Sequence, residues 1–246
     1  MTKRMKNLCI DFGNTFSKIG YFENEKLIEY FPKINSSTVV NYCESFDFEQ
    51  IMICSVTKSA EDLKREFGIL NKPVTILTVD TKLPIQKNYE TPETLGADRI
   101  AAAVGATVVF PDTNCLIIDA GTCIKYDFIE KGKVFQGGII APGLKMRFKA
   151  MHHFTKKLPL INEIEPWPKL IGKNTNQAMK SGVLNGMAAE INGIIEQYEA
   201  ELTKFKIILC GGDATVFESR LKKPTFVVPE LVTLGLNRIL INTIDI

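Results

Sequence analysis

Leu8-Cys-Ile-Asp-Phe-Gly-Asn-Thr15 is an apolar run that ends in an acid, a glycine and a threonine, and the chain repeats this arrangement at Ile117-Ile-Asp-Ala-Gly-Thr122. Behind each copy, apolar residues alternate with polar ones, a pattern typical of strands, and a short charged stretch interrupts the alternation. Each copy therefore predicts a strand, a tight glycine turn, a second strand, a charged hairpin turn and a third strand. The second and third strands are expected at 17–22 and 26–31 in the first copy and at 124–129 and 133–136 in the second.

The repeat predicts two similar halves, a first lobe over residues 1–112 and a second over 113–246. The boundary falls at the turn-rich stretch Pro111-Asp112-Thr113-Asn114. Strands and helices alternate in the rest of both halves, which argues for an α/β protein. Further strands are expected at 50–55, 74–79 and 206–210, and helices at 60–67, from Thr91 toward Val109, from near Thr175 to Leu202, at 214–220 and at 232–241.

Composition excludes several classes of protein. Of the 246 residues 45% are hydrophobic and 24% charged, which is ordinary for a globular chain and rules out wholesale disorder. A formal charge of +2 argues against a nucleic-acid partner, since such affinity comes from an excess of basic charge. The basic start lacks the long apolar region of a signal peptide, and no apolar run reaches the ~20 residues that span a bilayer. We expect a cytoplasmic protein with no membrane partner, whose six unpaired cysteines are reduced and bind no zinc.

The first copy of the repeat has the residues of a phosphate-binding loop. Gly13 lets the backbone turn sharply, and successive N–H groups in such a turn form a concavity for anions. Asn14 and Thr15 add polar donors, and Lys18 adds a positive charge. Asp11, at the end of the strand, is expected to organise Mg²⁺ through water, because Mg²⁺ gives up its water reluctantly. A hairpin turn built from Asp and Asn is the plainer interpretation of one such loop.

The second copy shifts the balance toward phosphate binding. Asp119-Ala-Gly-Thr122 repeats the first loop, and two facing loops can clamp the two ends of a polyphosphate. Gly211-Gly212-Asp213 follows a predicted strand and would let a planar or phosphorylated ligand approach the backbone. By itself, that glycine pair is also an ordinary turn between a strand and a helix.

Three further segments are open to a structural and a functional interpretation. Gly96-Ala97-Asp98-Arg99 lies near a predicted helix start, where an acid complements the helix dipole. The same residues could provide a general base and a guanidinium that binds a carboxylate, although spacing alone favours the structural interpretation. Thr175 is most simply a helix cap, and a hydroxyl that serves a substrate is the alternative. Gly137-Gly-Ile-Ile-Ala-Pro-Gly143 predicts a glycine-rich loop.

Taken in order, these motifs resemble type III pantothenate kinase. The set comprises Asp11-Phe-Gly-Asn-Thr15, Tyr89 and Pro92 ahead of Gly96-Ala-Asp-Arg99, Asp119-Ala-Gly-Thr122, Gly137 to Gly143, Thr175 and Gly211-Gly212-Asp213. Each motif alone is weak, but the ordered set covers nearly the whole chain. The family belongs to the acetate-kinase, sugar-kinase, Hsp70 and actin superfamily, so the resemblance implies two duplicated ribonuclease-H-like, actin-like lobes with a cleft between them.

The resemblance also implies a reaction, the ATP-dependent phosphorylation of pantothenate to 4′-phosphopantothenate, the first step toward coenzyme A. It assigns the proton acceptor to Asp98 and the ATP phosphates with Mg²⁺ to the loop from Asp11 to Lys18. Asp119 is similar to the ligand of a monovalent cation, K⁺ or NH₄⁺. The residues that resemble ATP contacts are Asp11, Gly13, Asn14, Thr15, Lys18, Thr122, Gly211 and Gly212. Those that resemble pantothenate contacts are Tyr89, Gly96, Ala97, Asp98, Arg99 and Thr175.

In the family the substrate site lies at a dimer interface, so a homodimer is implied. Two other interpretations remain. One is a catalytically silent homologue that regulates by binding nucleotide or DNA partners, which the presence of Asp11, Asp98 and Asp119 disfavours. The other is a kinase of the same fold that phosphorylates another acceptor, such as acetate or a sugar.

Overall fold

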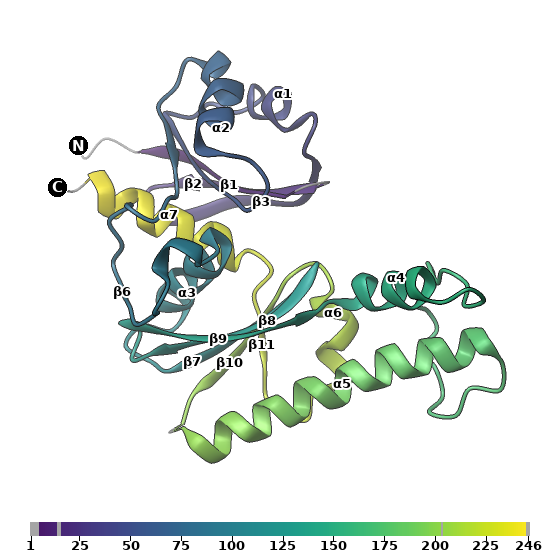
Figure 1. Cartoon of the computed structure of the whole chain (residues 1–246). Coiled ribbons are helices and arrows are strands. Elements are labelled where there is room, and N and C mark those ends of the chain that lie inside the picture. Colours follow the sequence, from purple (N-terminus) through teal and green to yellow (C-terminus); the bar gives the residue numbers. More distant parts are fainter. Residues whose placement is uncertain (1–4, 14–15, 203, 245–246) are drawn as a thin grey trace. The chain divides into compact units, whose positions relative to one another are not determined.

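The computed structural model describes residues 5–13, 16–202 and 204–244, and its elements form two mixed sheets (Figure 1). The first sheet has the order β3-β2-β1-β4-β5 and the second β11-β10-β7-β8-β9-β6. The strands of the first sheet are β1 (Lys6–Phe12), β2 (Phe16–Glu23), β3 (Lys26–Asn35), β4 (Gln50–Ser55) and β5 (Val74–Ile76). Those of the second are β6 (Gln86–Lys87), β7 (Cys115–Ala120), β8 (Cys123–Glu130), β9 (Val134–Pro142), β10 (Lys206–Cys210) and β11 (Phe226–Val227).

The two sheets share one topology. In chain order, the strands of the first sheet are arranged 3-2-1-4-5, and β7 to β11 take the same arrangement in the second, with β6 added beyond β9. In the first sheet β1, β2 and β3 pair antiparallel, while β1, β4 and β5 pair parallel. A shared order of five strands confirms the duplication that the repeated Asp-Gly-Thr pattern predicted.

The helices occupy the segments between and after these strands. They are α1 (Val39–Cys43), α2 (Ala60–Phe67), α3 (Ala97–Val109), α4 (Leu144–Phe154), α5 (Thr175–Glu201), α6 (Ala214–Phe217) and α7 (Leu231–Ile244), with short 3₁₀ turns η1 (Gly68–Leu70), η2 (Pro92–Thr94) and η3 (Glu218–Arg220). Among the described residues, no helix is long and apolar enough to span a bilayer.

Contacts divide the chain into two compact units. The first unit holds the described parts of 1–115, 127–137 and 228–246, and the second holds 116–126 and 138–227. The predicted lobes, 1–112 and 113–246, are defined by the repeat, and their boundary near residue 112 stays a prediction.

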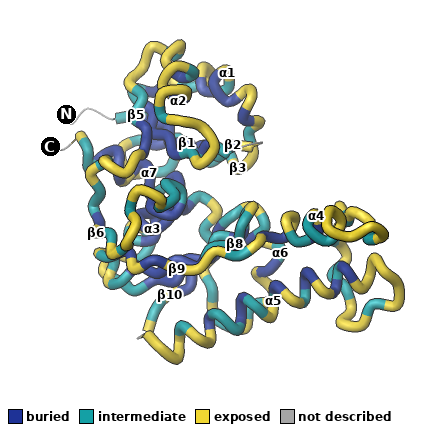
Figure 2. Tube along the Cα trace, viewed as in Figure 1, coloured by how far each residue is buried: buried dark blue, intermediate teal, exposed yellow. Residues whose placement is uncertain are grey.

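The first unit is layered around the first sheet. Because side chains alternate along a strand, Leu8, Ile10 and Phe12 face the core that α1 and α2 close, and there they meet Leu63 and Phe67. The helix α7 packs against β1 and β2 on the other face, and it also packs along α3. Figure 2 shows β1 as part of the buried centre of this unit. Burial on both faces fixes β1, and with it the position of Asp11 at its end.

The second unit contains the long helix α5. Its buried side chains include Met179, Val183, Met187, Ile191 and Ile195, which recur at steps of four. That spacing confirms the amphipathic helix predicted from near Thr175. Within the unit α5 packs against α4.

Three expectations about local structure were wrong. The helix expected from Thr91 makes only the turn η2, because Leu95 is extended with ψ 119°, and α3 begins at Ala97. Thr175 is not the cap of α5, since the Asn174 side chain accepts the Gln177 N–H at 2.9 Å. The glycine-rich segment before Gly143 is part of strand β9 rather than a loop, and a helix, α4, follows it directly.

Candidate active site

Asp11 stands near the end of β1, where its neighbours on both sides supply donors. Across the antiparallel pair lies Lys18, whose Nζ is 3.2 Å from Asp11 Oδ2. Across the parallel pair lies Cys54, whose Sγ is 3.6 Å from Oδ1. Burial, followed by the charge of Asp11, raises the pKa of the Cys54 thiol, so the thiol stays protonated and donates. Strand pairing thus holds the carboxylate between a cation and a thiol.

The turn after β1 requires glycine at its first position. A Cβ on Gly13 would lie 2.3 Å from the carbonyl oxygen of Phe16, a distance that no side chain tolerates. The predicted phosphate contacts Asn14 and Thr15 lie outside the described residues. The tight glycine turn expected here is therefore supported at Gly13.

Asp98 lies in the first turn of α3, which begins at Gly96 as the N-cap and Ala97. Its Oδ1 accepts the N–H of Arg99 at 2.9 Å, and its side chain is half-buried. The charge of Asp98 also contributes to the raised pKa of Cys54, after burial and the charge of Asp11. Since α3 packs against β4, the start of the helix brings Asp98 toward the strand ends that carry Asp11 and Cys54.

Arg99 is held by an acid that sequence reasoning missed. Both oxygens of Asp127 accept from Arg99 Nε, at 3.0 and 3.1 Å, and Oδ1 also accepts from Nη2. Both side chains are buried. Burial acts to lower the pKa of Arg99, but the hydrogen bonds and charge of Asp127 outweigh it, and the pKa is raised. On its other side the guanidinium faces Tyr89, whose hydroxyl accepts from Nη1 at 3.4 Å. The structure therefore brings the predicted substrate residues Tyr89 and Arg99 together.

Asp119 in the second unit repeats the environment of Asp11. It lies near the end of β7, and Lys125 on β8 places its Nζ 2.6 Å from Asp119 Oδ2. Both side chains are about one-eighth exposed. In each copy of the repeat, the leading aspartate thus forms an ion pair with a lysine of the following strand. Comparison of the two loop sequences alone did not predict this second similarity.

The Gly211-Gly212 turn meets the second loop. Gly211 has φ +95°, and a Cβ there would lie 2.3 Å from the oxygen of Ala120 and 2.5 Å from Asp119 Oδ1. The N–H of Asp213 donates to the Ala120 oxygen at 2.8 Å. Burial and the charge of Asp119 raise the pKa of Asp213, against the influence of Lys145. The predicted nucleotide motif and the predicted second phosphate loop therefore lie against each other within this unit.

The remaining predicted residues are exposed. Thr122 follows Gly121 at the tip of the turn, and its carbonyl accepts the Gly143 N–H at 3.2 Å. Gly212 is exposed beside Gly211, and Thr175 is exposed as the first residue of α5. The structure thus leaves the hydroxyls of Thr122 and Thr175 accessible.

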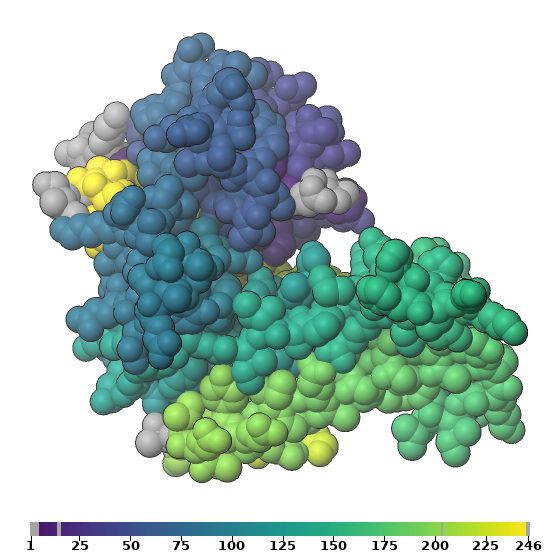
Figure 3. Space-filling view, in the orientation of Figure 1, coloured from purple at the N-terminus to yellow at the C-terminus, as the bar shows by residue number. Residues whose placement is uncertain are grey.

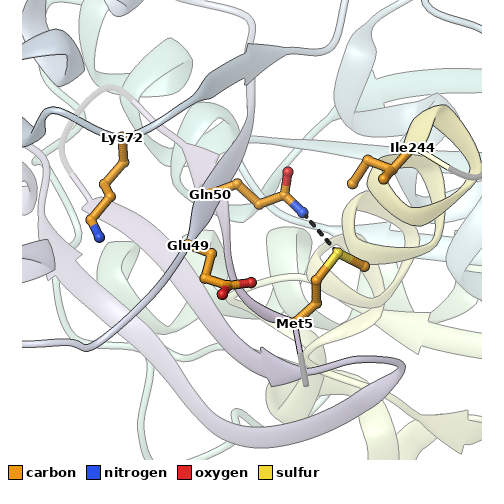
Figure 4. Close-up of a pocket in the computed structure, with 5 residues that line it drawn as sticks. All are labelled: Met5, Glu49, Gln50, Lys72 and Ile244. Carbon is orange, nitrogen blue, oxygen red and sulfur yellow. Dashed lines mark hydrogen bonds between the residues drawn. The ribbon is translucent and has the colours of Figure 1, made fainter. Parts of the chain in front are cut away.

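A surface hollow of about 510 Å³ lies elsewhere, between Met5, Glu49, Gln50, Lys72 and Ile244 (Figure 4). Gln50 pairs with Asn7 at the start of β1, whereas Asp11 pairs with Cys54 at its end. In α/β sheets ligands bind beyond the carboxyl ends of the parallel strands. The hollow therefore lies at the wrong end of the first sheet to be the site.

The acids fit one of the two expected ions better than the other. Among the described residues, no three His, Cys, Asp or Glu side chains gather into a group that could hold a metal. Mg²⁺ needs no such cage, because it binds through one or two carboxylates, waters and substrate phosphates, which suits Asp11. A monovalent cation at Asp119 would lie beside the ammonium of Lys125. Asp11 also has a lysine beside it, Lys18 at 3.2 Å, so it suits Mg²⁺ through the water shell of the ion. A monovalent cation bound directly to Asp119 fits less well, because Lys125 is in contact with that carboxylate at 2.6 Å.

Two sheets of one strand order, each with a strand that ends in an Asp-Lys pair and a glycine turn, define the duplicated ribonuclease-H-like class of phosphate-binding proteins. The comparisons agree. A sequence profile of type III pantothenate kinase matches residues 7–197. A type III pantothenate kinase of Cytophaga hutchinsonii is 45% identical over 238 residues, which are 95% of this chain and 98% of that protein. The chain belongs to the type III pantothenate kinase family.

Solved structures show the same fold at lower identity. A Campylobacter jejuni protein described as a Baf family transcriptional activator has a TM-score of 0.64 and 21% identity, over 97% of this chain and all of that one. A Listeria monocytogenes protein described as an N-acetylmannosamine kinase has a TM-score of 0.57 and 15% identity, over 97% and 99%. These likenesses support the actin-like, sugar-kinase type of fold that the motifs implied.

Proposed function

We propose that Asp98 is the general base of the reaction that family membership gives this chain, the phosphorylation of pantothenate by ATP in coenzyme A biosynthesis. The observation that carries the assignment is the place of Asp98 on the first turn of α3, half-buried and near enough to Cys54 at the end of β4 for its charge to help raise the pKa of that thiol. In a loose phosphoryl-transfer transition state, the acceptor hydroxyl must be oriented and its proton removed late. A carboxylate positioned at the acceptor hydroxyl can do both.

The two glycine turns are the proposed phosphate contacts. Asp11, Gly13 and Lys18, with Asn14 and Thr15, serve one end of the triphosphate, and Thr122, Gly211 and Gly212 serve the other. Mg²⁺, held through Asp11 and water, would supply positive charge to the phosphates. The Lys18 ammonium lies 3.2 Å from Asp11 Oδ2, and this contact holds the lysine side chain in one rotamer.

The proposed pantothenate contacts are the helix start from Gly96 to Arg99, together with Tyr89 and Thr175. Asp127 takes the Nε edge of Arg99, so only the other edge, which faces Tyr89, is left to serve a substrate carboxylate. This geometry supports a shared role for Tyr89 and Arg99 in holding the end of the substrate remote from the reacting hydroxyl.

Homodimerisation belongs to the proposal as well. Large apolar side chains are exposed on α4 and on the segment that joins it to α5: Phe154, Leu160, Leu170 and Ile171. Figure 3 shows this stretch of the second unit, in green, at the molecular surface. Exposed apolar side chains in such number favour association of subunits. We assign the protein to the cytoplasm, which the six free cysteines support.

The reaction is tested by following ADP release from the purified protein with ATP and Mg²⁺ in K⁺ buffer, with and without pantothenate. We expect release that depends on pantothenate. Release with acetate or a sugar in place of pantothenate would identify a kinase with another acceptor. No release with any acceptor, from folded protein that still binds ATP, would identify the silent regulator.

A further inference from the structure

We propose that the ammonium group of Lys125 takes the place of the monovalent cation at Asp119, so that this enzyme works without K⁺ or NH₄⁺. The inference rests on the proposed role of the second phosphate loop. It concerns a residue that the motifs did not single out, and it arises from the contact between Lys125 Nζ and Asp119 Oδ2 at 2.6 Å.

The charge of the Asp119 carboxylate is balanced without a bound ion. A K⁺ or NH₄⁺ ion at Asp119 would balance one carboxylate with one positive charge. Lys125 supplies that charge from the chain itself, and an ammonium with three N–H donors has the same charge and chemistry as NH₄⁺. A free ion placed on the same carboxylate would be repelled by the lysine, at a site where both side chains are only about one-eighth exposed and screening is weak.

The space around the Asp119 carboxylate is taken up by the chain. Asp119 Oδ2 is engaged by Lys125, and Oδ1 lies against Gly211, since a Cβ on that glycine would come within 2.5 Å of it. Groups of the chain therefore lie against both oxygens of the Asp119 carboxylate.

The same pairing of an aspartate with a lysine occurs in both copies of the repeat. In the first unit Asp11 is likewise paired with a lysine of the next strand, Lys18, at 3.2 Å. In both copies an aspartate near the end of the first strand thus forms an ion pair with a lysine of the next strand. In the second copy this lysine brings a permanent positive charge to the loop that we assign to the ATP phosphates, where it offsets the negative charge that develops during phosphoryl transfer.

The test compares ADP release at equal ionic strength in K⁺, NH₄⁺, Na⁺ and choline chloride. For the wild-type enzyme we expect rates that agree within about twofold in all four salts. A rate at least tenfold higher in K⁺ or NH₄⁺ than in choline would overturn the inference and leave the pantothenate reaction intact. Absence of pantothenate-dependent release in every salt would instead overturn the proposed function.

Lys125→Met provides the complementary test, because it keeps the length of the side chain and removes its charge. We expect its activity to fall at least tenfold in choline and to recover in part with K⁺ or NH₄⁺. The melting temperature of Lys125→Met should be higher in K⁺ than in choline, since an ion that binds only the folded state stabilises that state. Equal activity of Lys125→Met and wild type in choline would contradict the proposal.

Lys223→Met is the matched control, since Lys223 pairs with Glu199 at 2.8 Å in the same unit and away from the loop. It should show no new dependence on K⁺. If Lys125→Met does not fold, the double variant Asp119→Asn with Lys125→Met removes both charges together. K⁺ should then leave its melting temperature unchanged, and the salt series on the wild type decides the question by itself.

Discussion

At the scale of single residues, pairs of opposite charge hold the candidate side chains of each unit in place. Asp11 meets Lys18, Asp119 meets Lys125, and Asp127 meets Arg99. In each pair the acid holds a flexible cation in one orientation. If Lys18 and Lys125 contact the phosphates as proposed, they need little reorganisation when charge develops there, because each is already held by an aspartate.

Asp98 is the residue whose removal should cost activity most directly. In Asp98→Asn, turnover should fall by about 10² to 10⁴, the usual contribution of general acid–base catalysis, because the amide cannot accept the proton of the acceptor hydroxyl. Steady-state ADP release measures the turnover. The melting temperature of Asp98→Asn should stay close to that of the wild type, since the Asp98 side chain is only half-buried.

Asp80→Asn is the control for that experiment, because Asp80 is an exposed acid of the same unit outside the site. It should keep full turnover. An Asp98→Asn enzyme that also kept near-normal turnover would remove Asp98 from the role of base.

Sequence alone found both members of the Asp11–Lys18 pair but only one member of each of the other two pairs, Asp119 and Arg99. Asp11, Asp98 and Asp119 stand in short motifs with glycine, which are visible along the chain. Asp127 is one of 28 acidic residues, and nothing in its neighbours marks it out, because its importance comes from burial against Arg99 on a distant helix. Lys125 became significant only once the structure placed its ammonium against Asp119 from the neighbouring strand β8. Such pairs depend on how strands and helices pack together, which local sequence patterns do not specify.

At the scale of elements, prediction succeeded where periodicity is strong. The helix α2 has the predicted bounds Ala60–Phe67, and β4 has the predicted bounds Gln50–Ser55. It failed for α4, where a glycine-rich strand runs directly into a helix with little contrast between its faces. The glycines of β9 predict a loop from the sequence alone. In the structure the segment is a strand, because it pairs with neighbouring strands, and strand formation depends strongly on such context.

The crossing of α3 and α7 offers a test of packing between elements. A Cβ on Gly235 of α7 would lie 1.8 Å from the carbonyl oxygen of Ala101 on α3. Gly235→Ala should therefore lower the free energy of unfolding by about 1–3 kcal/mol or more, because backbone cannot move aside as a side chain can. Denaturant unfolding with an unchanged m-value would measure it.

Gly186→Ala on α5 is the matched control. Gly186 is an exposed helical glycine, and a Cβ there meets nothing within 4 Å. The substitution should raise stability by up to about 1 kcal/mol, since alanine is the better helix former. If both variants moved stability in the same direction, close contact between α3 and α7 would not be the cause.

At the scale of the whole molecule, the proposed homodimer follows from apolar surface that a lone chain leaves in water. Phe154, Leu170 and Ile171 are each about four-fifths exposed. Burying such side chains against a second copy would recover about 1.5–3 kcal/mol for each one fully covered. We therefore expect a particle of twice 27.5 kDa in sedimentation or light scattering at micromolar concentration.

The double variant Leu170→Asp with Ile171→Asp should shift that particle toward the monomer, because a charge buried at an apolar interface is strongly unfavourable. Ile69→Asp is its control, since Ile69 is an exposed apolar residue of the other unit. If the pantothenate site depends on the dimer, the monomeric variant should lose pantothenate-dependent ADP release and keep its affinity for ATP. A wild type that sediments as a monomer, or a charged variant that stays dimeric, would place the interface elsewhere or remove it.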